Sequence, residues 1–137
     1  MKKLDMSIKN QLIEKALEAR ENSYSPFSGF CVGAALLCSD GEIIVGTNVE
    51  NSSLGGTICA ERSALCAAVS AGKRDFDAIA IVGGKRGEKI SEGCAPCGIC
   101  RQFMAEFCGE DLPVLLYDGQ AVIETTLGEL LPGAFRL

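Results

Sequence analysis

The stretch Ala78-Ile79-Ala80-Ile81-Val82 is a short apolar run that ends at Gly83-Gly84. A run of this length, bounded by turn residues, is typical of a strand that is buried on both faces of a sheet. The segments on either side of it, over 59–72 and 98–108, carry apolar residues at helical spacing. A buried strand between two helices favours an α/β fold in which helices cover the sheet.

Two pairs of shorter strands flank this unit. Apolar runs over 30–37 and 43–45 are separated by Ser39-Asp40-Gly41, a turn sequence that predicts an antiparallel hairpin. Further strands are expected over 114–117 and 121–124, and the connection between them is so short that it permits only antiparallel pairing.

A first helix is expected over 7–22, with Ser7 as its N-cap, and a last helical turn over 126–131. No repeat or linker interrupts the chain, and its length fits a single domain over 1–137. Five strands and three main helices therefore predict an α/β fold, a three-layer α-β-α sandwich with one mixed five-stranded sheet.

The chain of 137 residues contains eight cysteines and no histidine. Without an imidazole it has no Ser-His-Asp triad, no Cys-His pair and no HExxH zinc site. A transition-metal site must therefore be built largely from sulfur. Proton transfer near neutral pH must fall to a carboxylate, a lysine, a tyrosine or a thiolate.

Thirteen Lys and Arg residues against eighteen Asp and Glu residues give a net charge of -5, which disfavours a nucleic-acid partner. No apolar run approaches the roughly eighteen residues of a membrane span. No apolar segment follows the N-terminal lysines as it would in a signal peptide. We therefore expect a cytoplasmic protein without a membrane partner, whose reduced cysteines serve a metal or chemistry.

The informative chemistry lies in Cys59-Ala60-Glu61-Arg62 and Pro96-Cys97-Gly98-Ile99-Cys100-Arg101, each at the start of an expected helix. Both helices follow strands of one sheet, so their N-termini can meet at its C-terminal edge and favour negative charge there. Thiolates from Cys59, Cys97 and Cys100 would leave a tetrahedral zinc ion with one open position. Three protein ligands and an open position are typical of a catalytic zinc site.

Glu61 follows Cys59 by two residues and would lie beside the open position without needing to ligate the metal. In a chain without histidine it is the natural proton carrier. Zinc bound by three thiolates carries a formal negative charge. We expect Arg62 and Arg101 to offset that charge by hydrogen-bonding the sulfurs, together with the two helix N-termini.

Cys-Ala-Glu followed by Pro-Cys-x-x-Cys resembles the motif of the zinc-dependent nucleoside and nucleobase deaminases. More closely, the chain is similar to the small homotetrameric cytidine deaminases along nearly its whole length, through six blocks in the same order. The blocks are Tyr24-Ser25-Pro26-Phe27-Ser28, Phe30-Cys31-Val32-Gly33-Ala34-Ala35-Leu36, Asn48-Val49-Glu50-Asn51, Cys59-Ala60-Glu61-Arg62, Pro96-Cys97-Gly98-Ile99-Cys100-Arg101-Gln102 and Glu129-Leu130-Leu131-Pro132-Gly133-Ala134-Phe135.

The resemblance implies one Zn²⁺ per chain, held by Cys59, Cys97 and Cys100. It implies the hydrolytic deamination of cytidine and deoxycytidine to uridine and deoxyuridine plus ammonia, the reaction of a pyrimidine-salvage enzyme. Water activated by the zinc would attack C4 of the base. Glu61 would protonate N3 and later the leaving ammonia.

The resemblance also implies the contacts to a small-molecule nucleoside substrate. Asn48 and Glu50 would hydrogen-bond the ribose hydroxyls. Phe30 would pack on the base, and Ala60 would offer backbone contacts to the pyrimidine. Phe135 would reach into the site of a neighbouring subunit, so that each site of a homotetramer is completed across an interface.

The chain departs from this family at two positions. Cys94 precedes Cys97 by three residues and could fill the fourth zinc position, which would make the site structural. Because Pro96 and the turn direct Cys97 toward the metal, we expect Cys94 to stay outside. Leu54 stands where relatives often carry a tyrosine, which leaves open the contact to the 5′ end of the sugar and the fine substrate preference.

Three classes of function compete: a pyrimidine nucleoside deaminase, a closed structural zinc module, and a dithiol redox protein that uses Cys97 and Cys100. Within the first class, another aminopyrimidine nucleoside or a nucleoside antibiotic is the alternative substrate. The four cysteines within apolar patterns are expected to pack in the core: Cys31, Cys38, Cys66 and Cys108.

Overall fold

Strand β3 (Phe76–Lys85) runs through the centre of the sheet, and residues 78–82 within it have no solvent exposure. The computed structural model of the protein describes residues 4–137; residues 1–3, whose lysines entered the expectation about a signal peptide, lie outside the described residues. The strand is longer than predicted. Gly83 and Gly84 do not end it but pair with β1 (Phe30–Cys38).

Five strands form one sheet in the order β2-β1-β3-β4-β5. β1 pairs antiparallel with both β2 (Ile43–Thr47) and β3. β4 (Pro113–Tyr117) pairs parallel with β3 and antiparallel with β5 (Val122–Thr126). The mixed five-stranded sheet and both predicted hairpins are therefore confirmed.

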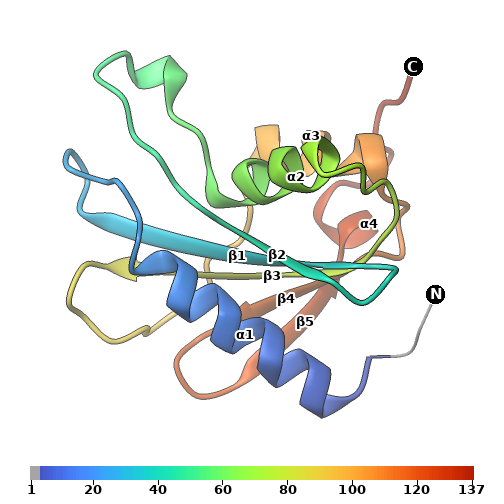
Figure 1. Ribbon diagram of the computed structural model, residues 1–137, viewed down its shortest axis with the longest axis horizontal. Coiled ribbons are helices and arrows are strands. Elements are labelled where there is room, and N and C mark those ends of the chain that lie inside the picture. Colours follow the sequence, from blue (N-terminus) through green and yellow to red (C-terminus); the bar gives the residue numbers. More distant parts are fainter. Residues whose placement is uncertain (1–3) are drawn as a thin grey trace.

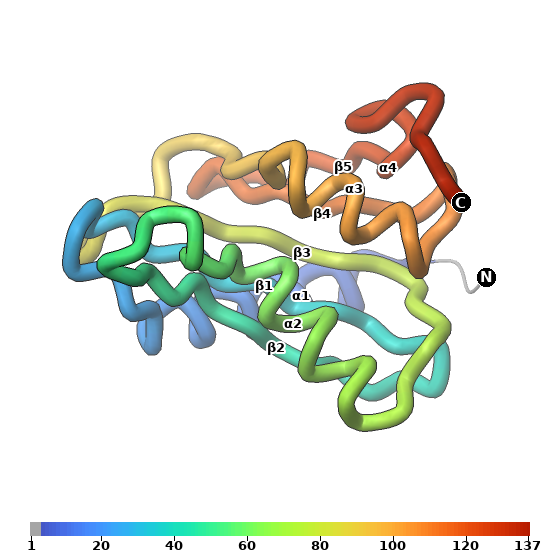
Figure 2. Tube along the Cα trace, turned by 90° about the horizontal axis from the view of Figure 1, so that it is seen from above, coloured from blue at the N-terminus to red at the C-terminus, as the bar shows by residue number. Residues whose placement is uncertain are grey.

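Helices cover both faces of this sheet. α1 (Met6–Arg20) lies on one face, while α2 (Ala60–Ser70), α3 (Gly98–Phe107) and the short α4 (Leu127–Leu130) lie on the other (Figure 1). Figure 2 shows α2 and α3 over the same side of the sheet, with α1 behind it. The three-layer α-β-α sandwich is thus confirmed.

The central strand supplies side chains to both cores because successive residues of a strand point to opposite faces. Ile79 and Ile81 pack in the core beneath α2 and α3. Ala78, Ala80 and Val82 pack in the core beneath α1. A strand that is buried on both faces therefore carries an unbroken apolar sequence, which is the pattern that indicated the fold.

The helix starts are set by residues just outside each helix. The first helix begins at Met6 because Asp5, not Ser7, is its N-cap and accepts a hydrogen bond of 2.8 Å from the backbone N–H of Ile8. Cys59 and Cys97 are the N-caps of α2 and α3. A short 3₁₀ turn, η1 (Leu54–Gly56), precedes Cys59 and was not expected.

Within residues 4–137, no helix combines the length and the apolar character that crossing a bilayer requires.

Candidate active site

The sulfur atoms of Cys59, Cys97 and Cys100 lie within 4.8 Å of one another. Two of these residues enter helices α2 and α3, and the third lies in the first turn of α3. The Sγ atoms of Cys59 and Cys97 are 3.8 Å apart, and all eight cysteines of the chain are free thiols. The three cysteines that the sequence singled out therefore form one cluster.

This cluster fits a zinc ion. Two sulfurs bound tetrahedrally at about 2.3 Å lie roughly 3.8 Å apart, which matches the separation of Cys59 and Cys97. A three-thiolate donor set is one that zinc accepts, and it leaves one position free. Among the described residues, Cys94 does not join this group, as expected.

Arg62 places positive charge beside the sulfurs. Its Nη2 donates to the carbonyl of Thr57 at 3.3 Å and to the Sγ of Cys59 at 3.5 Å. The pKa of Cys59 is lowered, first by a hydrogen bond from the Cys100 thiol and then by Arg62. The Nε of Arg62 is buried without a partner in the part of the chain described. The guanidinium thus stabilises thiolate, the form that binds metal.

Arg101 does not have the predicted role. Its Nε donates to the carbonyl of Pro96 at 2.7 Å, and its Nη1 donates to the carbonyl of Leu130 at 2.7 Å. The side chain therefore ties the loop that carries Cys97 to the end of α4. The expectation that Arg101 hydrogen-bonds a sulfur was wrong, because within residues 4–137 the hydrogen bonds of this side chain go to these two backbone carbonyls.

Glu61 lies in the first turn of α2 and is only 4% exposed. Burial raises the pKa of its carboxyl, and the nearby charge of Cys59 raises it further. It is not part of the sulfur cluster. A buried carboxyl with a raised pKa beside an open metal position is suited to taking up and giving back a proton.

The segment 48–50 is held beside the sulfur cluster by backbone hydrogen bonds on both sides. Val49 exchanges two hydrogen bonds of 2.9 Å with Ile58, the residue before Cys59. On the other side, the N–H of Tyr24 donates to Asn48, and the N–H of Glu50 donates to Tyr24. Residues far apart in sequence are thereby brought to one edge of the site.

Glu50 faces a cavity of about 430 Å³ that is lined by Phe27, Ser28, Glu50, Leu54 and Thr57. Its carboxylate accepts hydrogen bonds from the backbone N–H groups of Phe27 and Ser28, at 2.9 and 3.1 Å, and from the Ser28 hydroxyl. The Ser28 hydroxyl and these N–H groups lower the pKa of Glu50. The group therefore stays ionised at neutral pH.

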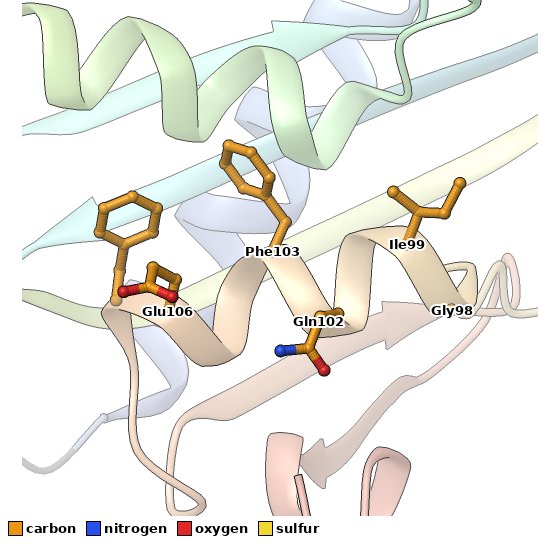
Figure 3. Close-up of a pocket in the computed structure, with 6 residues that line it drawn as sticks. Gly98, Ile99, Gln102, Phe103 and Glu106 are labelled. Atoms are coloured by element: carbon orange, nitrogen blue, oxygen red, sulfur yellow. The ribbon is translucent and has the colours of Figure 1, made fainter. Parts of the chain in front are cut away.

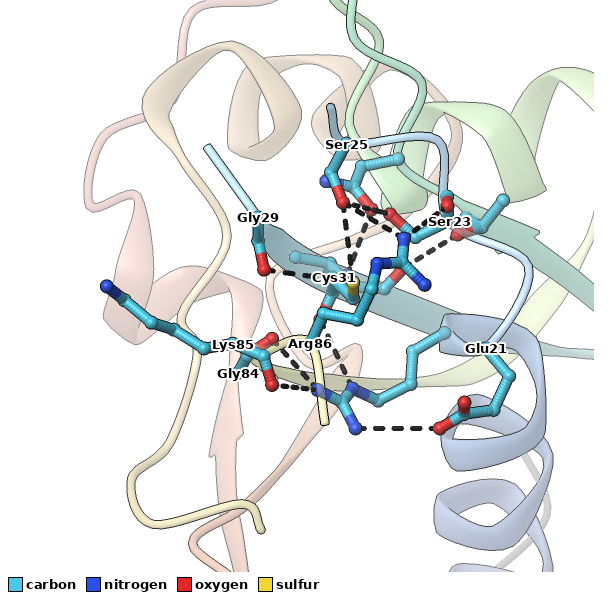
Figure 4. Close-up of polar contacts among 12 residues, drawn as sticks. Glu21, Ser23, Ser25, Gly29, Cys31, Gly84, Lys85 and Arg86 are labelled. Atoms are coloured by element: carbon cyan, nitrogen blue, oxygen red, sulfur yellow. Dashed lines mark hydrogen bonds and ion pairs between the residues drawn. The ribbon is translucent and has the colours of Figure 1, made fainter. Parts of the chain in front are cut away.

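Asn48 is 8% exposed and belongs to a polar network with Ser23 and Ser25, two residues that Figure 4 shows linked by hydrogen bonds. Its side-chain oxygen accepts from Ser23 and from the backbone of Val32, and its Nδ2 donates to the carbonyl of Phe30. The hydroxyl oxygens of Ser23 and Ser25 lie 3.1 Å apart. Asn48 is therefore fixed in orientation.

Phe30 and Cys94 meet over Gly83 in β3. A Cβ built on Gly83 would lie 2.8 Å from the Cys94 Sγ and 3.0 Å from the Phe30 Cε2. Only glycine leaves room for both side chains at this point. The close approach also explains why glycine stands at this position, which the sequence pattern had suggested to be a turn at the end of the strand.

A family model described as the cytidine and deoxycytidylate deaminase zinc-binding region matches residues 6–116. The chain belongs to this family. It is 51% identical over 128 residues to the cytidine deaminase of Halalkalibacterium halodurans, covering 93% of each protein. It is also 33% identical over 104 residues to the blasticidin-S deaminase of Bacillus cereus, covering 74% of each.

Solved structures of cytidine deaminases share this fold. That from Burkholderia pseudomallei superposes with a TM-score of 0.83 at 49% identity, covering 92% of this chain and 98% of that chain. That from Mycobacterium tuberculosis gives 0.80 at 41% identity, covering 93% and 97%. The protein is therefore a zinc-dependent deaminase, and the structural zinc module and the dithiol redox protein are set aside.

Two further residues of this deaminase that were predicted to contact the substrate, Ala60 and Phe135, differ in their exposure to solvent. Ala60, the first residue of α2, is fully buried beside Glu61. Phe135 is 67% exposed, and its carbonyl accepts a 2.8 Å hydrogen bond from Gln102. Among the cysteines expected in the core, Cys66 is exposed, because it lies on the outer face of α2.

The residues of the deaminase that hold Asn48 and Glu50 were not predicted from the sequence. Ser23, Phe27 and Ser28 make these contacts. Phe27 and Ser28 belong to one of the six recognised blocks, which was the available signal. Ser23 has no such signal, because only folding brings it to Asn48.

Proposed function

We propose that this deaminase converts cytidine and deoxycytidine to uridine and deoxyuridine, with release of ammonia, as a pyrimidine-salvage enzyme. One observation carries the proposal: a three-sulfur cluster lies beside the buried carboxyl of Glu61, with Asn48 and Glu50 held at the same edge. The relatives named cytidine deaminase, which match nearly the whole chain, support the same substrate.

Cys59, Cys97 and Cys100 hold the zinc ion in this proposal. When bound, the zinc supplies an activated water molecule as the nucleophile. Glu61 takes a proton from that water and delivers it to N3 of the pyrimidine, and it later moves the second proton of the same water to the amino group that leaves C4. The raised pKa of Glu61 supports this role, since burial favours the protonated form that the carboxyl must pass through when it carries a proton.

The nucleoside is positioned by four residues in the same chain. The ring of Phe30 packs on the base, and the backbone of Ala60 hydrogen-bonds the pyrimidine. Asn48 and Glu50 bind sugar hydroxyls, which selects a nucleoside over a free base. The cavity beside Glu50 supports this arrangement because it leaves space on the sugar side.

The proposal includes a homotetramer in which Phe135 enters the site of a neighbouring subunit. Phe135 is 67% exposed, so its ring is free to enter a neighbouring subunit. The surface of α3 supports the same arrangement, since a largely apolar cavity of about 580 Å³ opens there beside Ile99 and Phe103 (Figure 3). Arg62 stabilises the sulfurs within each subunit.

The proposal also treats residues 1–137 as one domain that works in the cytoplasm. A single sheet with helices on both faces supports the first statement. Eight free thiols support the second, because the cytosol keeps cysteines reduced.

A second candidate substrate is a nucleoside antibiotic, which the likeness to a blasticidin-S deaminase favours. Leu54 lines the cavity beside Glu50 and is strongly exposed there. An apolar side chain in this place offers no hydrogen bond to the end of the sugar, so a substrate with a different substituent would meet no polar mismatch. Turnover of blasticidin S exceeding that of cytidine would favour this candidate.

The deciding experiment compares the wild-type protein with Glu61→Gln. The amide fills the same space but cannot carry the proton, so we expect zinc content and thermal stability to be retained. Deamination of cytidine, followed by its ultraviolet change, should fall by at least about 100-fold. Glu14→Gln, an exposed residue on α1 and so on the opposite face of the sheet, is the matched control and should leave the rate per zinc ion unchanged. Near wild-type turnover by Glu61→Gln would refute the assigned mechanism.

A further inference from the structure

The carboxylate of Glu50 is almost filled by contacts within its own chain. Oε1 accepts from two backbone N–H groups, those of Phe27 and Ser28. Oε2 accepts from the Ser28 hydroxyl. Since each carboxylate oxygen has about two lone-pair sites, Oε2 keeps one acceptor site in the part of the chain described. Glu50 therefore presents an acceptor and no donor.

Asn48 differs from Glu50 in that its acceptor sites are filled and a hydrogen-bond donor remains. Its Oδ1 accepts from the Ser23 hydroxyl at 2.5 Å and from the N–H of Val32 at 2.9 Å, which uses both lone pairs. Its Nδ2 donates to the carbonyl of Phe30 at 2.8 Å, and among residues 4–137 it has no other partner. Asn48 therefore presents one remaining N–H donor.

A chain of hydrogen bonds fixes this polarity (Figure 4). The Arg86 guanidinium can only donate, and it reaches the Ser25 hydroxyl at 3.4 Å. The Ser23 hydroxyl has one proton, which goes to Asn48 because a carbonyl oxygen only accepts. The proton in the hydrogen bond between the two serines then comes from Ser25. The amide of Asn48 cannot reverse without breaking this order.

A hydroxyl group is the match for a hydrogen-bond donor and an acceptor that lie next to each other. A hydroxyl can accept from the Asn48 N–H and donate to Glu50 at the same time, whereas a carbonyl only accepts and an ammonium only donates. The two residues are separated by one position in an extended segment, so their side chains lie on the same side of it.

We propose that Ser28 and Ser23 are positioning residues that set Glu50 as the acceptor and Asn48 as the donor for one sugar hydroxyl. The inference rests on the proposed nucleoside substrate. The two serines do not touch the reacting atoms. They act through Glu50 and Asn48, and so they determine how strongly the enzyme distinguishes a sugar that carries the hydroxyl from one that lacks it.

The test uses the zinc-loaded enzyme with Ser28→Ala, Ser28→Thr and Ser39→Ala. Each is assayed with cytidine and with 2′,3′-dideoxycytidine, and the ratio of the two kcat/KM values is compared. Ser39 is the matched control, since its hydroxyl also donates to a carboxylate, Asp77, at 2.8 Å, but outside the site.

We expect Ser28→Ala to raise KM for cytidine roughly 10-fold, the effect of one hydrogen bond to a charged group, while kcat changes less than about twofold. The preference for cytidine over the dideoxy substrate should fall by the same factor. Ser28→Thr, which keeps the hydroxyl, should restore the preference, and Ser39→Ala should leave it unchanged. Ser23→Ala should reduce the preference in the same way.

A fall in kcat/KM that is equal for both substrates would overturn the proposal, since a general loss of structure does not discriminate between them. Wild-type protein that turns over neither nucleoside would instead refute the proposed function. Calorimetric binding of uridine and 2′,3′-dideoxyuridine to the same variants then decides the positioning role without turnover. An unchanged difference in affinity between wild type and Ser28→Ala would overturn it.

Discussion

Cys94 illustrates how position separates a packing thiol from a metal ligand. Its sulfur lies over Gly83, next to the ring of Phe30. Burial raises the pKa of Cys94 to about 11, with a further contribution from the charge of Glu61. The residue lies outside the group formed by the sulfurs of Cys59, Cys97 and Cys100, so it packs in the fold and contributes no ligand.

This difference predicts opposite effects of two single substitutions. Cys94→Ala should retain one zinc ion per chain, because Cys94 contributes no ligand to the cluster. Cys97→Ala should lose the metal, since only two sulfurs would remain. Zinc is measured by elemental analysis of purified protein, with circular dichroism as the check on folding. A folded Cys94→Ala protein without zinc would contradict the assignment.

For single residues, the sequence predicted those whose position depends only on the neighbouring sequence. The spacing of Cys59, Glu61, Cys97 and Cys100 placed the ligands and the carboxyl at two helix starts. The partners of Arg101 were not predictable, because its acceptor at Leu130 approaches only after the C-terminal segment has folded. Which atoms become hydrogen-bond partners therefore depends on contacts between segments that are distant in the sequence.

Among the elements, α2 depends on a close approach to β2. A Cβ at Gly46 would lie 2.4 Å from the N of Ala64 and 2.6 Å from the carbonyl oxygen of Ala60. Both are backbone atoms of α2, so they cannot move aside as a side chain would. The helix that begins at Cys59 is therefore positioned by the absence of a side chain on the strand beneath it.

Gly46→Ala should displace α2 from the sheet. We expect a loss of about 3 kcal/mol in the free energy of unfolding, measured in denaturant, because the overlap is with backbone. Zinc affinity should fall as well, since Cys59 moves with the helix. Gly55→Ala is the control, because a Cβ there meets nothing within 4 Å. Equal stability and zinc affinity in the two variants would contradict this account.

The elements themselves were largely predictable because their patterns are periodic. One exception has a clear physical cause: Gly83 and Gly84 were interpreted as the end of the strand, whereas the strand continues through both to pair with β1. A glycine that relieves a crowded approach has the same sequence signal as one that makes a turn. The two kinds of glycine are distinguished by the atoms that pack against them in the fold, and not by the residue type.

For the whole molecule, the sulfur cluster links metal binding to stability. Zinc binds the folded cluster and not three separated thiols, so its removal by a chelator should lower the thermal midpoint by roughly 10 °C or more. Adding zinc back should restore the midpoint, while magnesium should not. An unchanged midpoint after proven zinc loss would count against a coupling between metal and fold.

The stability of the fold and the stability gained from zinc should both decrease toward acid pH. The pKa of Cys59 in the metal-free fold is lowered from an ordinary value of 9.0, so its thiolate stabilises the fold above that pH. This contribution is lost as the pH falls through the lowered pKa. Because protons also compete with zinc for the sulfurs, the zinc-dependent gain in thermal midpoint should shrink steadily toward acid pH.

The order of strands in the sheet has a consequence for how the enzyme acquires its metal. Phe30 pairs with Lys85, and Cys38 pairs with Phe76, so this ladder closes across a long intervening segment that contains Cys59. Pairing between such distant segments is slow to form, because loop-closure entropy opposes it. We therefore expect the three thiols to meet late in folding. A nascent chain that ends before Cys97 carries only one of the three ligands, so it has no zinc site to fill until the start of α3 has been made.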